Sequence, residues 1–257
     1  MKQEVYNSIE TWFNSYVEGF ENENEKDNII LKRDHSFRVV KLTKELGEKL
    51  DLSDSDILLI QCIALLHDLG RFKQLVNYGT FSDTDEINHI QLGLATLTEH
   101  DVLAELNEEE RNIVLECITY HHEPVLPKNI NSLALPLIQV LRDADTIDIL
   151  HIVSNYYLNN KIGTNKRLEM ELSDKPDVSK KVYQSIMDEK QVAFKNILTI
   201  NDLKLYQMSL IYDLNFKISF KIISEKTYLK QIFETLPKKD LVIDMYRQMK
   251  IFLENQL

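Results

Sequence analysis

The chain has 257 residues, 44% of them hydrophobic and 28% charged, which is the balance of an ordinary globular protein long enough to bury a sizeable core. Its formal net charge of −11 at pH 7 argues against a nucleic-acid polymer or an anionic membrane surface as a partner, because both would repel it. The charge does not exclude a small phosphorylated substrate that a local cluster of metal ions and cationic side chains could hold.

Several features of the sequence favour a cytoplasmic, helical protein. No apolar run approaches the ~20 residues that span a bilayer, and the first segment, MKQEVYNSIE, is too polar for a signal-peptide core. Cys62 and Cys117 lie in apolar helical surroundings, so we expect reduced core thiols. Six glycines and five prolines are few for this length, which favours long helices.

The first predicted elements are two helices. Apolar residues at helical spacing cover residues 1–20, and the acidic segment ENENEKDN at residues 21–28 is predicted to be a loop. The helical pattern resumes at Ile29 and continues to Leu50, with His35 near the start of this second helix.

A third predicted helix is apolar on almost every side from Ile57 to Leu66, which is typical of a helix buried in the middle of a domain. Ser53 and Asp54 supply its N-cap chemistry, and Gly70 is expected to end it. Residues 72–89 are predicted to be mainly loop.

Three more helices are predicted before residue 159. Asp83 or Thr84 is expected to cap a helix that runs to about His100. Asn107 and Glu110 have the spacing of a capping box at the start of the next helix. Pro136 opens a strongly apolar helix that also carries three aspartates.

The polar region 159–177 is the best candidate break in the chain. We therefore predict a domain at residues 1–158 and a helical extension at residues 159–257, or one single domain. Helical patterns fill the second part at residues 178–198, 201–213, 216–223, 225–236 and 239–257. No strand alternation is found, so the predicted fold class is all-α.

The chemistry starts at the end of the buried third helix, where His67 and Asp68 follow the apolar run. An ionised carboxylate is costly to bury unless it is paired or coordinates a metal. Imidazole and carboxylate together are the ligand mix of zinc, iron and manganese sites. This doublet therefore predicts a metal centre.

Other parts of the chain could supply further ligands, and each has a simpler explanation. The candidates are His35, His89, His121, His122 and the set Asp143, Asp145 and Asp148. A single histidine on an apolar face is more often a hydrogen-bonded core residue, and spaced acids on a helix are more often a solvated stripe. We expect His100 and His151 to be surface or packing residues.

The order and spacing of these residues point to one family. A histidine, the doublet His67-Asp68, a single and a paired histidine, and then Ala144-Asp145 resemble the HD-domain superfamily of metal-dependent phosphohydrolases. The resemblance covers residues 35 to about 148 and implies an HD-type helical bundle. It further implies four core metal ligands, namely His35, His67, Asp68 and Asp145, with Asp143 as the alternative to the last.

The segments HDLGR, NHIQLG and YHHE are similar to the subset of this family with two metal ions, which includes the cyclic-dinucleotide phosphodiesterases of the HD-GYP type. In that resemblance Asp68 bridges both ions, and His89, His121 and His122 complete the second site. The chain departs from the subset in two ways. PVLPKN follows Glu123 where the glycine-tyrosine-proline signature would stand, and Arg71 replaces the usual lysine.

The resulting hypothesis is a metal-dependent phosphohydrolase for a small phosphorylated molecule, such as a nucleotide phosphomonoester or phosphodiester. Two divalent ions (iron, manganese or zinc) would activate a water at Asp68, and Arg71 would bind the phosphate. Two alternatives stay open: a di-iron oxygenase of the HD type, and a metal-containing regulatory or ligand-binding protein without catalysis. The sequence indicates neither the substrate nor the oligomeric state.

Overall fold

The computed structural model describes residues 1–20, 25–84 and 86–257. Within these ranges the chain is helical, and the only β-type pairing is an isolated bridge between Ser173 and Thr199. The predicted all-α class is therefore confirmed. The residues form two compact units, Met1–Ala144 and Asp145–Leu257, and the boundary falls inside one helix, α7.

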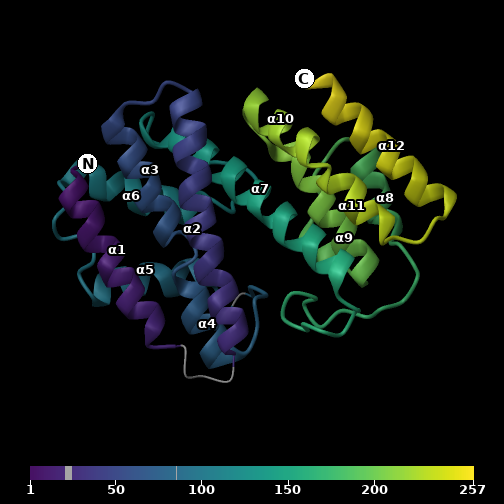
Figure 1. Cartoon of the computed structure of the whole chain (residues 1–257), viewed down its shortest axis with the longest axis horizontal. Coiled ribbons are helices and arrows are strands. Elements are labelled where there is room, and N and C mark those ends of the chain that lie inside the picture. The colour runs from purple at the N-terminus through teal and green to yellow at the C-terminus, as the bar shows by residue number, and fades with distance from the viewer. Residues whose placement is uncertain (21–24, 85) are drawn as a thin grey trace. The chain divides into compact units, whose positions relative to one another are not determined.

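The first unit consists of six helices and the beginning of α7 (Figure 1). Their bounds are α1 (Gln3–Glu18), α2 (Lys26–Lys49), α3 (Asp54–Leu66), α4 (Gly70–Tyr78), α5 (His89–Glu99), α6 (Glu108–Tyr120) and α7 (Ala134–Asn159). Helix α3 contacts α1, α2 and α6, so its apolar surface is covered on several sides, as its composition predicts.

An aromatic core connects α1 with α4 in this unit. Phe13 of α1 and Phe72 of α4 are almost fully buried, and their ring centroids lie 5.9 Å apart in an edge-to-face arrangement. Phe72 directly follows Arg71, so the packing of this ring also fixes the first turn of α4. Cys62 and Cys117 are free and buried, as predicted, and burial raises the pKa of the Cys62 thiol to about 12.

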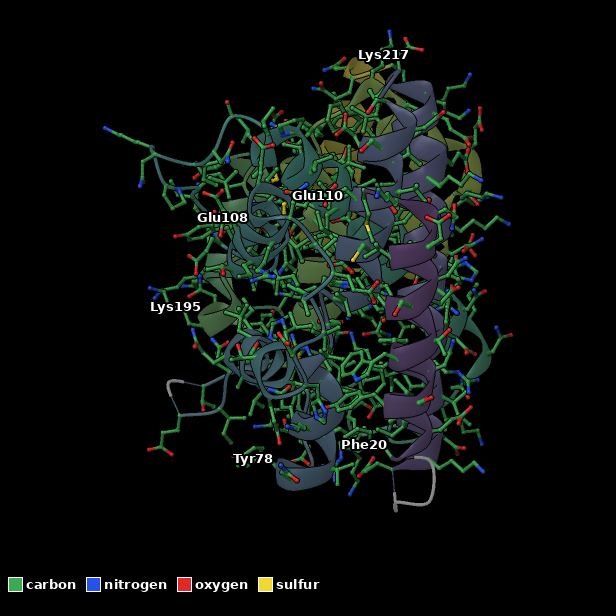
Figure 2. All side chains as sticks on the ribbon, turned by 90° about the vertical axis from the view of Figure 1, so that its left-hand side faces the viewer. Phe20, Tyr78, Glu108, Glu110, Lys195 and Lys217 are labelled. Carbon is green, nitrogen blue, oxygen red and sulfur yellow. The ribbon has the colours of Figure 1, made fainter. Side chains whose placement is uncertain are left out.

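Side-chain caps define where three of these helices begin. The Ser53 hydroxyl accepts a hydrogen bond from the amide of Asp56, which confirms it as the N-cap of α3. The predicted capping box of Asn107 and Glu110 is present at the start of α6, whose first turn carries the glutamates labelled in Figure 2. The cap of α5 was predicted wrongly: it is Asn88, which accepts from Ile90 and Gln91, and not Asp83 or Thr84.

Two other boundaries also differ from the predictions. Helix α2 begins at Lys26, so its polar first residues were mistaken for loop, and His35 lies well inside the helix. Residues 21–24 of the predicted loop lie outside the described ranges. Gly70 does not end α3 but begins α4, which continues to Tyr78 and so replaces the first part of the segment 72–89 that was predicted to be mainly loop. A three-residue turn from His67 to Leu69 separates these two helices.

The second unit holds the rest of α7 and the carboxy-terminal helices, whose bounds are α8 (Lys180–Met187), α9 (Ile200–Ser209), α10 (Lys217–Lys226), α11 (Tyr228–Glu234) and α12 (Asp240–Asn255). Helix α8 is shorter than the pattern of residues 178–198 predicted, because the chain turns at Glu189 with a positive φ of 54°. The predicted boundary at residue 159 coincides with the last residue of α7 and stays a prediction. No helix in the described ranges combines the length and apolar character that crossing a bilayer requires.

Candidate metal centre

His67 and His121 are placed in the same way, each as the C-cap residue of a helix, α3 and α6 respectively. The Nδ1 atom of His67 lies 2.7 Å from the carbonyl oxygen of Ala64, and Nδ1 of His121 lies 2.7 Å from that of Ile118. A carbonyl oxygen only accepts, so each Nδ1 carries the hydrogen and satisfies a carbonyl at the end of the helix. Each Nε2 therefore keeps its lone pair for a metal ion.

His89 also carries its hydrogen on Nδ1, but here a carboxylate accepts it instead of a backbone carbonyl. It is the first residue of α5, and its Nδ1 lies 2.7 Å from Oδ2 of Asp83. The other oxygen of Asp83 accepts the backbone amide of His89 at 2.9 Å. A carboxylate that binds the far nitrogen of a ligating histidine is a common support of metal sites, because it fixes the orientation and tautomer of the ring. Sequence reasoning considered Asp83 only as a helix cap and missed this contact.

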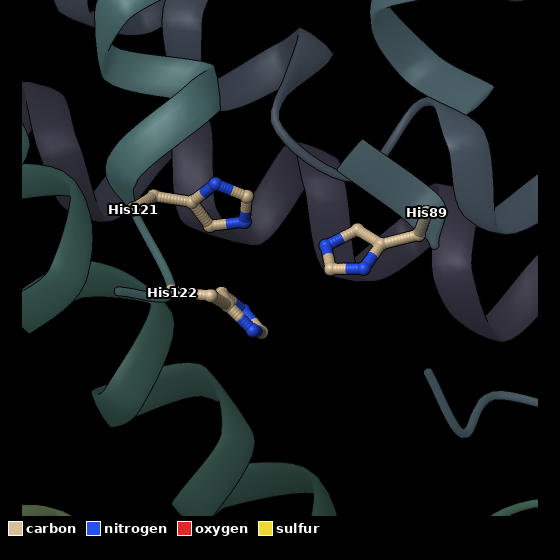
Figure 3. Close-up of side chains that lie close together, drawn as sticks. All are labelled: His89, His121 and His122. Carbon is tan, nitrogen blue, oxygen red and sulfur yellow. The ribbon is translucent and has the colours of Figure 1, made fainter. Parts of the chain in front are cut away.

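The predicted ligands form two groups. His35, His67 and Asp145 can each offer one ligand atom, and these atoms lie within 4.8 Å of one another; we call them the first group. Asp145 follows Ala144 directly in α7, and Asp143 is not in the group. The second group is His89, His121 and His122, whose ligand atoms also lie within 4.8 Å of one another and whose rings point toward one another in Figure 3.

Asp68 lies between the ligands of the two groups. Its Oδ2 is 3.6 Å from Nε2 of His35 and 3.7 Å from Nε2 of His67. Its Oδ1 is 3.5 Å from Nε2 of His89, in the second group. One oxygen of the carboxylate therefore faces each group, which is the geometry of a carboxylate that can bridge two ions.

Two cations flank the Asp68 carboxylate. The Lys32 ammonium is 2.5 Å from Oδ2, and Nε of Arg71 is 3.4 Å from Oδ1. Burial tends to raise the pKa of Asp68, but the surrounding groups, Lys32 first among them, outweigh it and hold that pKa well below its usual range. Lys32 was missed by sequence reasoning, although it precedes His35 by three residues and thus lies on the same face of one helix.

Arg71 ties the centre to the segment that follows α4. Its Nη1 donates to Oε1 of Gln74 at 2.8 Å, to the carbonyl oxygen of Phe81 at 2.7 Å and to Oδ1 of Asp83 at 3.3 Å. Its Nε is buried and has no hydrogen-bond acceptor among the described residues. Arg71 thus holds the backbone near Asp83 while one of its donors remains directed at the centre.

Two imidazoles of the second group, those of His89 and His121, are held in the neutral form. Burial, together with the nearby charge of Arg71, lowers the pKa of His89 to about 3. Burial and the neighbouring imidazoles likewise hold the pKa of His121 well below its usual value. A neutral imidazole is the form that ligates a metal, so neither ring needs to lose a proton at neutral pH.

Orphaned polar atoms show that these residues fit a metal ion. Within the described ranges, Nε2 of His89, Nε2 of His121 and Oδ1 of Asp68 are buried and have no hydrogen bond. Each such group costs about 1 to 3 kcal/mol when it is left without a partner. Three lone-pair donors that converge in this way are explained by a cation, and the mixture of nitrogen and oxygen suits zinc, iron or manganese.

The structure also gives the burial of the three aspartates of α7 and the surroundings of the two histidines outside the groups. Asp143, Asp145 and Asp148 are all buried, so the interpretation as a solvated stripe is wrong. His100 is exposed and packs against Trp12, with ring centroids 5.6 Å apart. His151 lies 6.1 Å from the ring of Tyr228, which makes it a packing residue as expected.

Comparison with known proteins gives one finding. Residues 33–153 match the family model described as the HD domain. The matched range includes Asp68 and every residue of both groups. No curated protein and no solved structure matches the chain.

Proposed function

We propose that this chain, which belongs to the HD-domain superfamily through residues 33–153, is a metal-dependent phosphohydrolase that acts on a small phosphorylated molecule. HD domains bind divalent metal ions and are typically found in phosphohydrolases. The single observation that carries the proposal is the position of Asp68, with one carboxylate oxygen directed at each of two groups of three ligands.

The two groups would hold two divalent ions, with Asp68 as the shared ligand. His35, His67 and Asp145 would bind the first ion, and His89, His121 and His122 the second. Bound ions of this kind lower the pKa of a water molecule toward neutrality and neutralise the charge of phosphate oxygens. The imidazole-rich set favours iron, manganese or zinc over magnesium, which prefers oxygen ligands.

The protein's own cations supply the rest of the phosphate site. A chain with a net charge of −11 needs a local positive focus to attract an anion, and Lys32 and Arg71 provide it. The buried Nε–H of Arg71 is available to donate to a phosphate oxygen, because Nη1 is the nitrogen that holds Gln74, Phe81 and Asp83. The Lys32 side chain is 18% exposed, so it can turn from Asp68 toward a bound substrate.

The free, buried cysteines agree with a reducing compartment, and we propose a cytoplasmic location. The proposed activity is supported by Asp68 and the two ligand groups, and not by the carboxy-terminal helices.

The test is metal analysis followed by an activity panel. The protein is purified without chelator, its iron, manganese and zinc are quantified, and generic phosphomonoesters, phosphodiesters and nucleotides are assayed with each metal. We expect about two ions per chain and phosphate release that is equal in air and under nitrogen. Turnover that requires dioxygen would replace the proposal with an oxygenase, and a loaded protein inactive on every substrate would leave a binding protein.

A further inference from the structure

We propose that Asp83 is a positioning residue that fixes the tautomer and orientation of His89 and thereby makes the second group able to bind its ion. The inference rests on the proposed metal centre. It concerns a residue outside both ligand groups, which acts on the ion only through His89.

The two oxygens of Asp83 have different partners. Oδ1 accepts from three donors, namely the backbone amide of His89 at 2.9 Å, Nε2 of Gln74 at 2.9 Å and Nη1 of Arg71 at 3.3 Å. Oδ2 accepts from Nδ1 of His89 at 2.7 Å. The carboxylate is therefore held in one orientation by three bonds and uses its second oxygen for the imidazole.

This arrangement decides which nitrogen of His89 carries the hydrogen. Because Oδ2 only accepts, the hydrogen must be on Nδ1, and the lone pair is on Nε2. Nε2 is buried, lies 3.5 Å from Oδ1 of Asp68 and has no hydrogen bond among the described residues. The lone pair is thus aimed at the position that the second ion would share with Asp68.

Asparagine at position 83 should reverse this choice without changing the size of the side chain. The three donors at Oδ1 would hold the amide oxygen in that place, so the amide nitrogen would face Nδ1 of His89. An amide nitrogen only donates, and Nδ1 would have to accept. The hydrogen of the imidazole would then move to Nε2, where it blocks the ion.

The experiment compares Asp83→Asn with Glu99→Gln, a control at the other end of the helix that His89 begins, whose carboxylate bonds only Lys73 in the described contacts, at the surface. Nitrogen-15 NMR of the metal-free proteins reports the tautomer of each histidine, and the His89 signals are assigned by their loss in His89→Gln. Metal analysis after loading with zinc reports the ions per chain. We expect Asp83→Asn to move the proton of His89 to Nε2, and to lower zinc affinity of the second site about 10- to 100-fold, leaving about one ion per chain.

Asp83→Ala gives a second test that does not depend on the amide. The Asp83 side chain is 31% exposed, so formate can enter the space that alanine leaves. We expect formate, and not chloride at the same ionic strength, to restore the second zinc ion.

The outcomes separate this inference from the proposed function. Wild-type protein that binds two zinc ions beside an Asp83→Asn protein with two ions of unchanged affinity, or with the hydrogen still on Nδ1, overturns the inference alone. Wild-type protein that binds no zinc overturns the metal centre and the inference with it. Loss of the second ion in Glu99→Gln as well would make the effect unspecific, and would also overturn the role of Asp83.

Discussion

The backbone of Gly70 lies directly against the backbone of His89. A Cβ atom on Gly70 would come within 1.9 Å of the carbonyl oxygen of His89 and within 2.6 Å of the amide nitrogen of Gly93. Gly70 follows Asp68 by two residues, and His89 begins α5. The close approach of α4 and α5 therefore sets the distance between the shared carboxylate and a ligand of the second group.

Gly70→Ala should force these backbones apart. We expect it to lower the free energy of unfolding by about 1 to 3 kcal/mol, as overpacking commonly does, and to weaken the second metal site by moving His89. Urea denaturation and metal analysis measure the two effects. The control is Gly47→Ala in α2, where the new Cβ meets only side chains, the nearest at 3.2 Å, so stability should change by less than about 1 kcal/mol. Equal stability of both variants and wild type would contradict the prediction.

Asp68→Ala should remove both ions, because it deletes the one ligand that both groups share. Several kcal/mol of charge stabilisation would be lost, so we expect phosphate release to fall about 1000-fold. Asp34→Ala is the matched control, since Asp34 also neighbours a ligand in sequence but bonds Arg33 at the surface. The bridging role would be disproved by an Asp68→Ala protein that retains its full metal content and turnover.

Lys32→Met should affect the metal-free protein more than the loaded one. Without metal, Lys32 is the nearest cation to the buried Asp68 carboxylate, and removing one member of such a pair costs about 1 to 3 kcal/mol. Bound ions would neutralise the same carboxylate and reduce the loss. Thermal denaturation with and without zinc tests this, with Lys44→Met as the control for an exposed lysine of the same helix. A loss that is equal in both states would refute the idea.

The metal-free protein should lose stability as the pH falls below neutrality. The pKa of His89 is about 3 in the folded chain and 6.5 at its ordinary value, so between these limits only the unfolded chain binds the proton. The contribution is therefore fully present above pH 6.5 and decreases by about 1.4 kcal/mol per pH unit as the pH falls toward 3. The lowered pKa of His121 acts in the same direction.

Urea denaturation between about pH 7.5 and about pH 4.5, without metal, measures this slope. His89→Gln should show a shallower slope, because glutamine does not titrate. A free energy of unfolding that stays constant over this range would show that the imidazoles are not held neutral by the fold. Below the ordinary carboxyl value of 3.8, the lowered pKa of Asp68 predicts a further loss.

One part of the centre could be predicted from a strong local signal. His67 follows the apolar run of the third predicted helix, at the helix end that the structure shows. Asp68 is unusual in sequence because a carboxylate directly follows a buried helix. This signal is local, so one sequence suffices to find it, whereas His35, His89, His121, His122 and Asp145 were predicted only through the resemblance to the HD-domain superfamily.

The supporting contacts were missed because they depend on how distant segments pack. The side chains of Asp83 and His89 form a hydrogen bond although they are six residues apart. Both Asp83 and Asn88 are residue types that cap helices, so the sequence alone does not show which of them is the N-cap of α5. Gly70 was interpreted as a helix stop, whereas its missing side chain serves the contact with His89. Lys32 lies inside the helix predicted from Ile29, but its contact with Asp68 depends on how α2 packs against the end of α3, which the sequence pattern does not show.

His122 differs from the other five residues of the two groups in being exposed to solvent. An ion in the first group would be enclosed, whereas an ion in the second group would have a side open to chelators and to an arriving anion. We therefore expect stepwise chelation to yield a folded, half-loaded form before the empty one. The supply of metal in the cell, and not only the abundance of the protein, would then set how much of it is active.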